Sequence, residues 1–146
     1  MPQWRVEQLR LTTFCPSDLN QPTPAWWREV GGAEPPNQSR QQGIGIQHSG
    51  PIRGDYCQLT LEIKSDRIDW VMGVPPAQAM TTGFPSFDEF EVGVRVFREI
   101  MAPWIRNREN VKRMALGAVV TIGVPDRLTG YRELQPLLPA IQLDIE

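Results

Sequence analysis

Alternating apolar and polar positions predict several strands in the first half of the chain. The clearest pattern covers Tyr56–Ile63, in which Cys57, Leu59 and Leu61 fall on one face while polar side chains fall on the other. Because successive side chains of a strand point to opposite faces, this segment is expected to bury one face. Weaker alternation predicts three more strands, and short turns would join neighbouring strands into an antiparallel meander. These strands are Trp4–Cys15, Gly43–Ser49 and Arg67–Val74.

A helical spacing of apolar residues begins after Ser86. Ser86 and Glu89 form a capping-box pattern, in which each side chain would bond a free backbone amide at the start of a helix. Pro103 would end the helix, because proline lacks the helical donor and clashes with the preceding turn. We therefore predict a helix from Phe87 to about Ala102. Its core-facing side chains are expected to be Phe87, Phe90, Val94, Phe97 and Met101.

Prolines and glycines delimit a short helix near the N-terminus. Pro24 suits the first helical turn, and Gly31-Gly32 would end the helix after Val30. The segment Ala33–Gln42 that follows consists largely of Pro, Asn, Gln, Ser and Arg, which bury little apolar surface. We expect that segment to be a mobile loop.

The last third of the chain predicts one long strand, one short helix and a final strand. Val111–Val124 is apolar almost throughout, which is typical of a central strand covered on both faces. Asp126 is placed to cap a helix that runs to Leu134, and Ile141–Glu146 alternates as a strand inside which the chain ends. The elements together predict a single α+β domain over residues 1–146, an antiparallel sheet of four to five strands with one long and one or two short helices packed on it.

Composition and charge exclude little. The 146 residues carry a formal net charge of −2, which gives no long-range attraction to nucleic acid or to an anionic membrane. No uncharged apolar stretch approaches the ~20 residues of a spanning helix, and the charged N-terminus does not resemble a signal peptide. We therefore expect a cytoplasmic protein in which Cys15 and Cys57 stay reduced.

The residue types used in catalysis do not form a recognisable pattern. His48 is the single histidine and lies in a glycine-rich segment, where we expect it to be solvated. Cys57 falls on the apolar face of its strand and is expected to be an inert core thiol. Asp55, Glu62 and Lys64 imitate a metal-dependent nuclease motif, but seven residues of strand would hold the two carboxylates roughly 23 Å apart. We expect no catalytic residue, no metal site and no cofactor.

Two features indicate a surface for binding protein. Trp26 and Trp27 are adjacent, and adjacent residues of a helix cannot share one buried face, so at least one indole is expected near the surface. Exposed tryptophan often anchors a partner, although a lid over the edge of the core would use the same pair. The final strand would leave an edge open to pairing. The candidate interaction residues are Trp26, Trp27, Gln142 and Asp144.

A basic segment between the long helix and the next strand is the best candidate for nucleic-acid contact. Glu109 interrupts this segment and the domain is net acidic, so we expect a solvated link in which nucleic-acid binding is an alternative function. The candidate contacts are Arg106, Arg108, Lys112 and Arg113.

Six segments distributed over most of the chain carry a resemblance to known proteins. They are Trp4–Thr13, Trp26-Trp27, Arg67–Trp70, Lys112–Ala118, Gly130-Tyr131 and Leu137–Pro139. In this order they resemble a sporadically distributed family of uncharacterised bacterial proteins. The resemblance implies an α+β fold, and it transfers no activity because none of the segments is a catalytic motif. Members of that family continue beyond the position of Glu146, so the resemblance leaves open whether this chain is a complete protein or a fragment.

Three classes of function stay open. The leading hypothesis is a non-catalytic protein-interaction module, such as a subunit of a bacterial defence or mobile-element assembly, which binds another protein or a second copy of itself. It rests on the absence of catalytic motifs and on the aromatic residues. The alternatives are a nucleic-acid-associated accessory subunit and an enzyme whose site matches no motif. The sequence identifies no small-molecule ligand.

Overall fold

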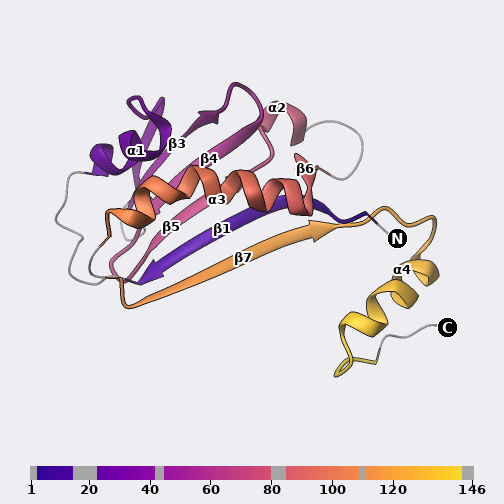
Figure 1. Cartoon of the computed structure of the whole chain (residues 1–146). Coiled ribbons are helices and arrows are strands. Elements are labelled where there is room, and N and C mark those ends of the chain that lie inside the picture. Colours follow the sequence, from indigo (N-terminus) through magenta and orange to yellow (C-terminus); the bar gives the residue numbers. More distant parts are fainter. Residues whose placement is uncertain (1–2, 15–22, 42–44, 80–84, 109–110, 143–146) are drawn as a thin grey trace.

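The described part of the chain contains seven strands, four α-helices and a short 3₁₀ helix (Figure 1). The computed structural model describes residues 3–14, 23–41, 45–79, 85–108 and 111–142. The strands are β1 (Arg5–Phe14), β2 (Asn37–Gln41), β3 (Gly45–Ile52), β4 (Cys57–Ile63), β5 (Ile68–Gly73), β6 (Asp88–Glu89) and β7 (Arg113–Thr121). The helices are α1 (Thr23–Gly31), α2 (Pro76–Ala79), α3 (Phe90–Arg106), α4 (Arg127–Leu134) and the 3₁₀ helix η1 (Gln135–Leu137).

All seven strands belong to one antiparallel sheet. Its order is β2-β3-β4-β5-β1-β6, and β7 also pairs with β1. Leu11 of β1 lies between Trp70 of β5 and Leu116 of β7, so β5 and β7 occupy opposite edges of β1. The α+β class and the meander of β3, β4 and β5 are confirmed. The sheet is larger than the predicted four to five strands, because β2 and β6 are polar and short and show no hydrophobic period.

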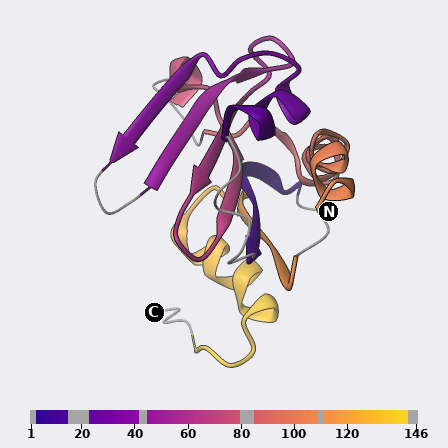
Figure 2. The same cartoon turned by 90° about the vertical axis from the view of Figure 1, so that its left-hand side faces the viewer.

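One face of the sheet is apolar and holds the core. On β4, Cys57, Leu59 and Leu61 are fully buried, as their alternation predicts. Helices α1 and α3 both lie on this side of the sheet (Figure 2), and the buried side chains of α3 belong to the same cluster as those of β4. The opposite face carries polar side chains such as Gln58 and Thr60, which are half-buried. Side-chain alternation thus assigns the two faces as expected.

The long helix is displaced by about one turn from its predicted position. It begins at Phe90, because Asp88 and Glu89 are used as strand β6 and pair with β1. Ser86 does not cap it; its hydroxyl oxygen instead accepts a hydrogen bond of 2.7 Å from Nε of Arg5. The helix also continues through Pro103 to Arg106.

Two side chains explain why the helix passes through a proline. Trp104 follows Pro103 directly and is fully buried, with its ring edge-on to Trp70 of β5 at a centroid distance of 5.8 Å. An internal proline costs about 3 kcal/mol, and burying an indole in the core offsets a loss of that size. Packing of Trp104 therefore extends the helix beyond the proline that was expected to end it.

The segment predicted to be a mobile loop contains β2. Its residues from Asn37 to Gln41 pair in register with Ser49 to Gly45 of β3. The described side chains of β2 are exposed, so this strand is held by backbone hydrogen bonds at the edge of the sheet and not by apolar burial. A hydrophobic pattern does not detect strands of this kind.

The short helices α1 and α4 occur where they are predicted. Helix α4 begins after Asp126, whose Oδ1 accepts a hydrogen bond of 2.8 Å from the amide of Thr129. No helix in the described ranges is both long enough and apolar enough to cross a membrane.

Candidate interaction surface

The tryptophan pair is buried, which corrects the prediction that at least one indole lies near the surface. Trp26 and Trp27 are only 1% and 3% exposed. The ring of Trp27 stacks on Trp70 of the sheet at a centroid distance of 6.1 Å, whereas the ring of Trp26 faces Arg108 just beyond α3. Helix α1 thus packs on the sheet with one face and on Arg108 with another, so two of its faces are buried. The premise for a tryptophan anchor at the surface was wrong.

Arg108 is part of this packing and is not a free basic residue. Its side chain is 5% exposed, and its guanidinium lies 5.3 Å from the ring centres of both Trp26 and Trp104. Nη2 of Arg108 donates to the two carboxylate oxygens of Glu29 at 2.8 and 2.7 Å. The predicted contact between Arg108 and nucleic acid therefore loses its basis, because the charge is already neutralised inside the fold.

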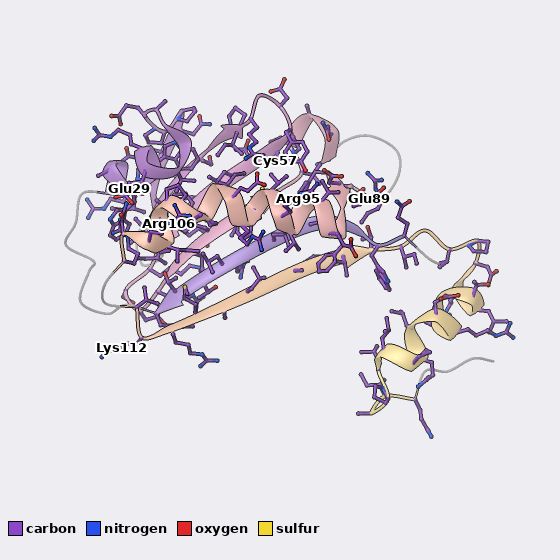
Figure 3. The ribbon with its side chains drawn as sticks, viewed as in Figure 1. Glu29, Cys57, Glu89, Arg95, Arg106 and Lys112 are labelled. Atoms are coloured by element: carbon purple, nitrogen blue, oxygen red, sulfur yellow. The ribbon has the colours of Figure 1, made fainter. Side chains whose placement is uncertain are left out.

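The other predicted basic residues lie at one end of the molecule. Arg106 ends α3 and Lys112 precedes β7, and both are exposed near the same end of the sheet (Figure 3). Arg113 is exposed too, and its guanidinium lies 5.5 Å from the ring centre of Phe14. Glu89 lies at the opposite end of the sheet (Figure 3). The two ends of the sheet therefore differ in charge.

The predicted C-terminal strand is not present in the part that the structure describes. Ile141 lies in a bend and Gln142 has no regular secondary structure; both are exposed. Asp144 and its neighbours 143–146 lie outside the described residues. The open edge that we expected at this strand is found elsewhere.

That edge belongs to β7, the longest apolar run of the sequence. β7 pairs with β1 along its whole length, from Arg113 opposite Phe14 to Thr121 opposite Arg5. Among the described strands none pairs with the other edge of β7. The prediction of a central strand was therefore wrong, and the backbone groups along the outer edge of β7 are open to another strand.

Both faces of β7 are exposed as well. Leu116 is 61% exposed and Met114 50%, and they lie on the face that continues the apolar core face, opposite Leu11 and Thr13 of β1. Val119, on the other face, is 46% exposed. Helix α3 covers the core face over the middle of the sheet but leaves β7 bare. The apolar side chains of β7 thus lack the cover that their pattern predicts.

Helix α4 and the residues after it extend this exposed surface. No side chain of α4 is buried, and the helix lies beyond the Thr121 end of β7, on the side of the free edge (Figure 1). Among the described elements, α4 packs mainly on η1. Apolar side chains exposed in this arm are Leu128, Leu137, Leu138 and Ile141. We call β7 together with this arm (residues 127–141) the β7 surface.

The signal for this surface was present in the sequence but was interpreted as a buried strand. No charged residue occurs from Met114 to Pro125, and exposed edges in natural sheets usually carry charges that prevent pairing. The apolar pattern correctly indicated a strand that needs cover on two faces. It could not indicate that the described chain leaves those faces uncovered.

The groups with potential reactivity are shielded. His48 is not in a solvated turn as expected; it lies in β3 and is fully buried, and burial lowers its pKa. Burial raises the pKa of the Cys57 thiol to about 12, in agreement with an inert core cysteine. Across the residues that the structure describes, no three His, Cys, Asp or Glu side chains are grouped so as to hold a metal ion.

One charged network lies on the polar face of the sheet. Asp69 is 1% exposed and accepts hydrogen bonds from the hydroxyl of Thr12 at 2.5 Å, from Nζ of Lys64 at 3.0 Å and from Nε of Arg67 at 3.2 Å. Lys64 also contacts Glu62 at 2.9 Å. Burial alone would raise the pKa of Asp69, but the three donors together lower it below its ordinary value. Two of the residues that imitate a nuclease motif, Glu62 and Lys64, thus form an ion pair with each other, and Lys64 also pairs with Asp69 of β5.

A shallow hollow of about 330 Å³ lies on the same polar face. Its lining includes Gln8, Gln58 and Thr60, and Gly73 of β5 faces both glutamines across the sheet. The absence of a side chain at Gly73 explains the depression.

Comparison of the chain with models of protein families, with curated proteins and with solved structures finds no match. The geometry of this chain is therefore the basis of the functional argument that follows.

Proposed function

We propose that this domain is a non-catalytic protein-interaction module that binds a strand of another polypeptide along the free edge of β7. The observation that carries the proposal is the exposure of Leu116, Met114 and Val119 on a strand whose outer edge has no partner among the described residues. Strand addition of this kind obtains affinity from backbone hydrogen bonds and specificity from the alternating side chains.

The composition of the edge supports this proposal. A solvent-exposed edge without charges pairs readily with other chains, and natural sheets avoid this by placing lysine, proline or a bulge at the edge. The cationic residues lie at one end, with Arg113 as the first residue of β7 and Lys112 directly before it, and none occurs between Met114 and Thr121. An edge of this composition is favourable where pairing is the function.

A bound partner would also bury the exposed apolar side chains on both faces of β7. Full burial of an exposed leucine or methionine contributes about 1.5–3 kcal/mol. Met114 and Leu116 are 50% and 61% exposed, so a partner that covers both would gain about 2–3 kcal/mol before its entropic costs. The arm around α4, which exposes Leu137 and Ile141, offers further apolar surface to the same partner.

Site-specific photo-crosslinking in cells that produce the chain tests the proposal. A photoreactive phenylalanine derivative replaces Leu116 in one variant and Arg95, an exposed residue of α3, in the matched control. We expect a discrete crosslinked product from position 116 and none from position 95. The crosslinked polypeptide, once identified by mass spectrometry and purified, should slow amide hydrogen exchange in β7 when it is mixed with the chain; if it is the chain itself, exchange in β7 should slow as the concentration of the chain is raised. Equal yields from the two positions, or unchanged exchange in β7, would contradict the proposal.

A further inference from the structure

β7 has three apolar residues on each side of its central glycine. The strand runs from Arg113 to Thr121, so Gly117 lies at its midpoint, and nothing approaches the position where a Cβ of Gly117 would stand. We propose, on the basis of the interaction function above, that the strand that binds β7 is β7 of a second copy of this chain, antiparallel and centred on Gly117.

Antiparallel pairing about Gly117 matches apolar residues of the two copies. Met114 would lie opposite Val120 of the other copy, Leu116 opposite Ala118, and Gly117 opposite Gly117. In this register both residues of each pair lie on the same face of the combined sheet, because opposite residues of an antiparallel pair point to the same side. The bare apolar face of β7 would therefore continue into the same face of the second copy, as one stripe across both sheets.

The charges favour this direction of pairing over the parallel one. Arg106 and Lys112 lie at the end of the sheet where β7 begins with Arg113, whereas Glu89 lies at the other end (Figure 3). Glu91 is in the first turn of α3, directly after Glu89, and Arg5 of β1, opposite Glu89 and Thr121, is a cation at that end. Antiparallel pairing brings the basic end of each copy to the acidic end of the other. It also holds the two Arg113 side chains about 27 Å apart along the strand direction, well beyond the screening length of about 8–10 Å. Parallel pairing in register would place them side by side.

The arm around α4 is positioned to cover the second copy. It leaves the Thr121 end of β7 on the side of the free edge (Figure 1), which in the antiparallel arrangement is the Met114 end of the other strand. Leu137 and Ile141, which are 58% and 50% exposed, are apolar side chains that this arm offers to the second copy. The arm carries Arg127, Arg132 and Glu133, and Asp126 directly before it offsets the remaining positive charge, so the arm and its cap together add no net charge to either end.

Cysteine crosslinking reports on the register directly. Opposite residues of an antiparallel pair have Cα atoms about 4.5–5.5 Å apart, within the range of about 4.4–6.8 Å that a disulfide spans. In a Cys15→Ser background, the purified Gly117→Cys variant should therefore form a disulfide-linked dimer under mild oxidation. Ala115→Cys and Val119→Cys alone should not, because identical residues would be about 13 Å apart along the strands. A mixture of these two variants should be linked, since residues 115 and 119 face each other.

The outcomes separate this inference from the function on which it rests. Rapid linkage of Gly117→Cys and of the mixed pair, with the circular dichroism of the unmodified chain retained, supports the second copy. Absence of linkage, together with a monomer mass in analytical ultracentrifugation, overturns it. If photo-crosslinking at position 116 then identifies a different polypeptide, the interaction function stands while the second copy is excluded. If neither experiment gives a product, both proposals fail.

Discussion

Arg108 donates both of its closest hydrogen bonds to the carboxylate of Glu29, at 2.8 and 2.7 Å, and thereby ties the end of α3 to α1. The pair is separated by 79 positions in the sequence. Indole rings of Trp26 and Trp104 lie on the guanidinium at 5.3 Å each. A charge in this position stabilises the contact between two helices and is withdrawn from solvent.

We predict that Arg108→Ala destabilises the fold by about 3 kcal/mol. Removal of one partner of a buried ion pair costs about 3–5 kcal/mol, and the lower end applies because Glu29 is 29% exposed and regains some water. Urea unfolding at neutral pH measures the change. Arg106→Ala is the matched control, since Arg106 is exposed on the last turn of the same helix and should stay within about 0.5 kcal/mol of the original chain. Equal losses for the two variants would show that the pair contributes nothing to stability.

The same region shows which part of the fold a local pattern cannot predict. The spacing of Pro24 and Gly31 located α1 correctly, since helix boundaries depend on nearby residues. The burial of both Trp26 and Trp27 depends on Arg108 and on the sheet, which contact α1 from two sides. The expectation that a helix buries a single face does not hold for a helix that packs on two different parts of the fold.

Two phenylalanines of α3 test which residues of the helix lie in the core. Phe90 and Phe97 both lie on the predicted apolar stripe, yet Phe97 is 3% exposed and Phe90 39% exposed. Phe90 is the first residue of the helix, at the point where the chain leaves β6, so it lies at the margin of the core. We expect Phe97→Ala to cost about 3–5 kcal/mol, as for a buried phenylalanine, and Phe90→Ala clearly less. Denaturant midpoints of the two variants give the comparison, and a larger loss at Phe90 would mean that the helix face is wrong.

The error at β7 has a different physical origin. A continuous apolar run indicates that both faces of a strand are to be covered, and this inference holds whether the cover comes from the same chain or from another. The run Met114–Val120 predicted the strand correctly. Its place at an edge follows from pairing with β1, which is a long-range contact that the pattern of residues does not encode.

The thiol of Cys57 should be almost unreactive in the folded protein. Its pKa is raised to about 12 by burial, so the thiolate that reacts with disulfide reagents is scarce at pH 8. In a Cys15→Ser background we expect very slow reaction with a chromogenic disulfide in buffer and complete reaction in urea. Asp66→Cys in that background, on an exposed turn, should react quickly without denaturant. If Cys57 reacted in buffer without urea as fast as the cysteine of the control, β4 would be shown to open freely.

Asp69 should make the stability of the domain depend on pH in the acid range. Its carboxylate is 1% exposed and bonded by Thr12, Lys64 and Arg67, and these donors hold its pKa below the ordinary value although burial acts in the opposite direction. A group whose pKa is lower in the folded than in the unfolded state stabilises the fold above its unfolded pKa, which is about 3.9 for aspartate. That contribution is lost as the pH falls from there through the lower pKa of the folded state.

We therefore predict that Asp69→Asn is less stable than the original chain at pH 7 and that the gap narrows as the pH falls below about 4. The asparagine cannot ionise, so the variant loses the ion pairs to Lys64 and Arg67 at every pH, whereas the original chain loses them only on protonation. Urea midpoints measured from pH 7 to pH 3 follow both curves. Asp55→Asn, in an exposed turn, is the control, and its urea midpoint should change with pH in the same way as that of the original chain. A constant gap between Asp69→Asn and the original chain over this range would mean that the ionisation of Asp69 is not linked to folding.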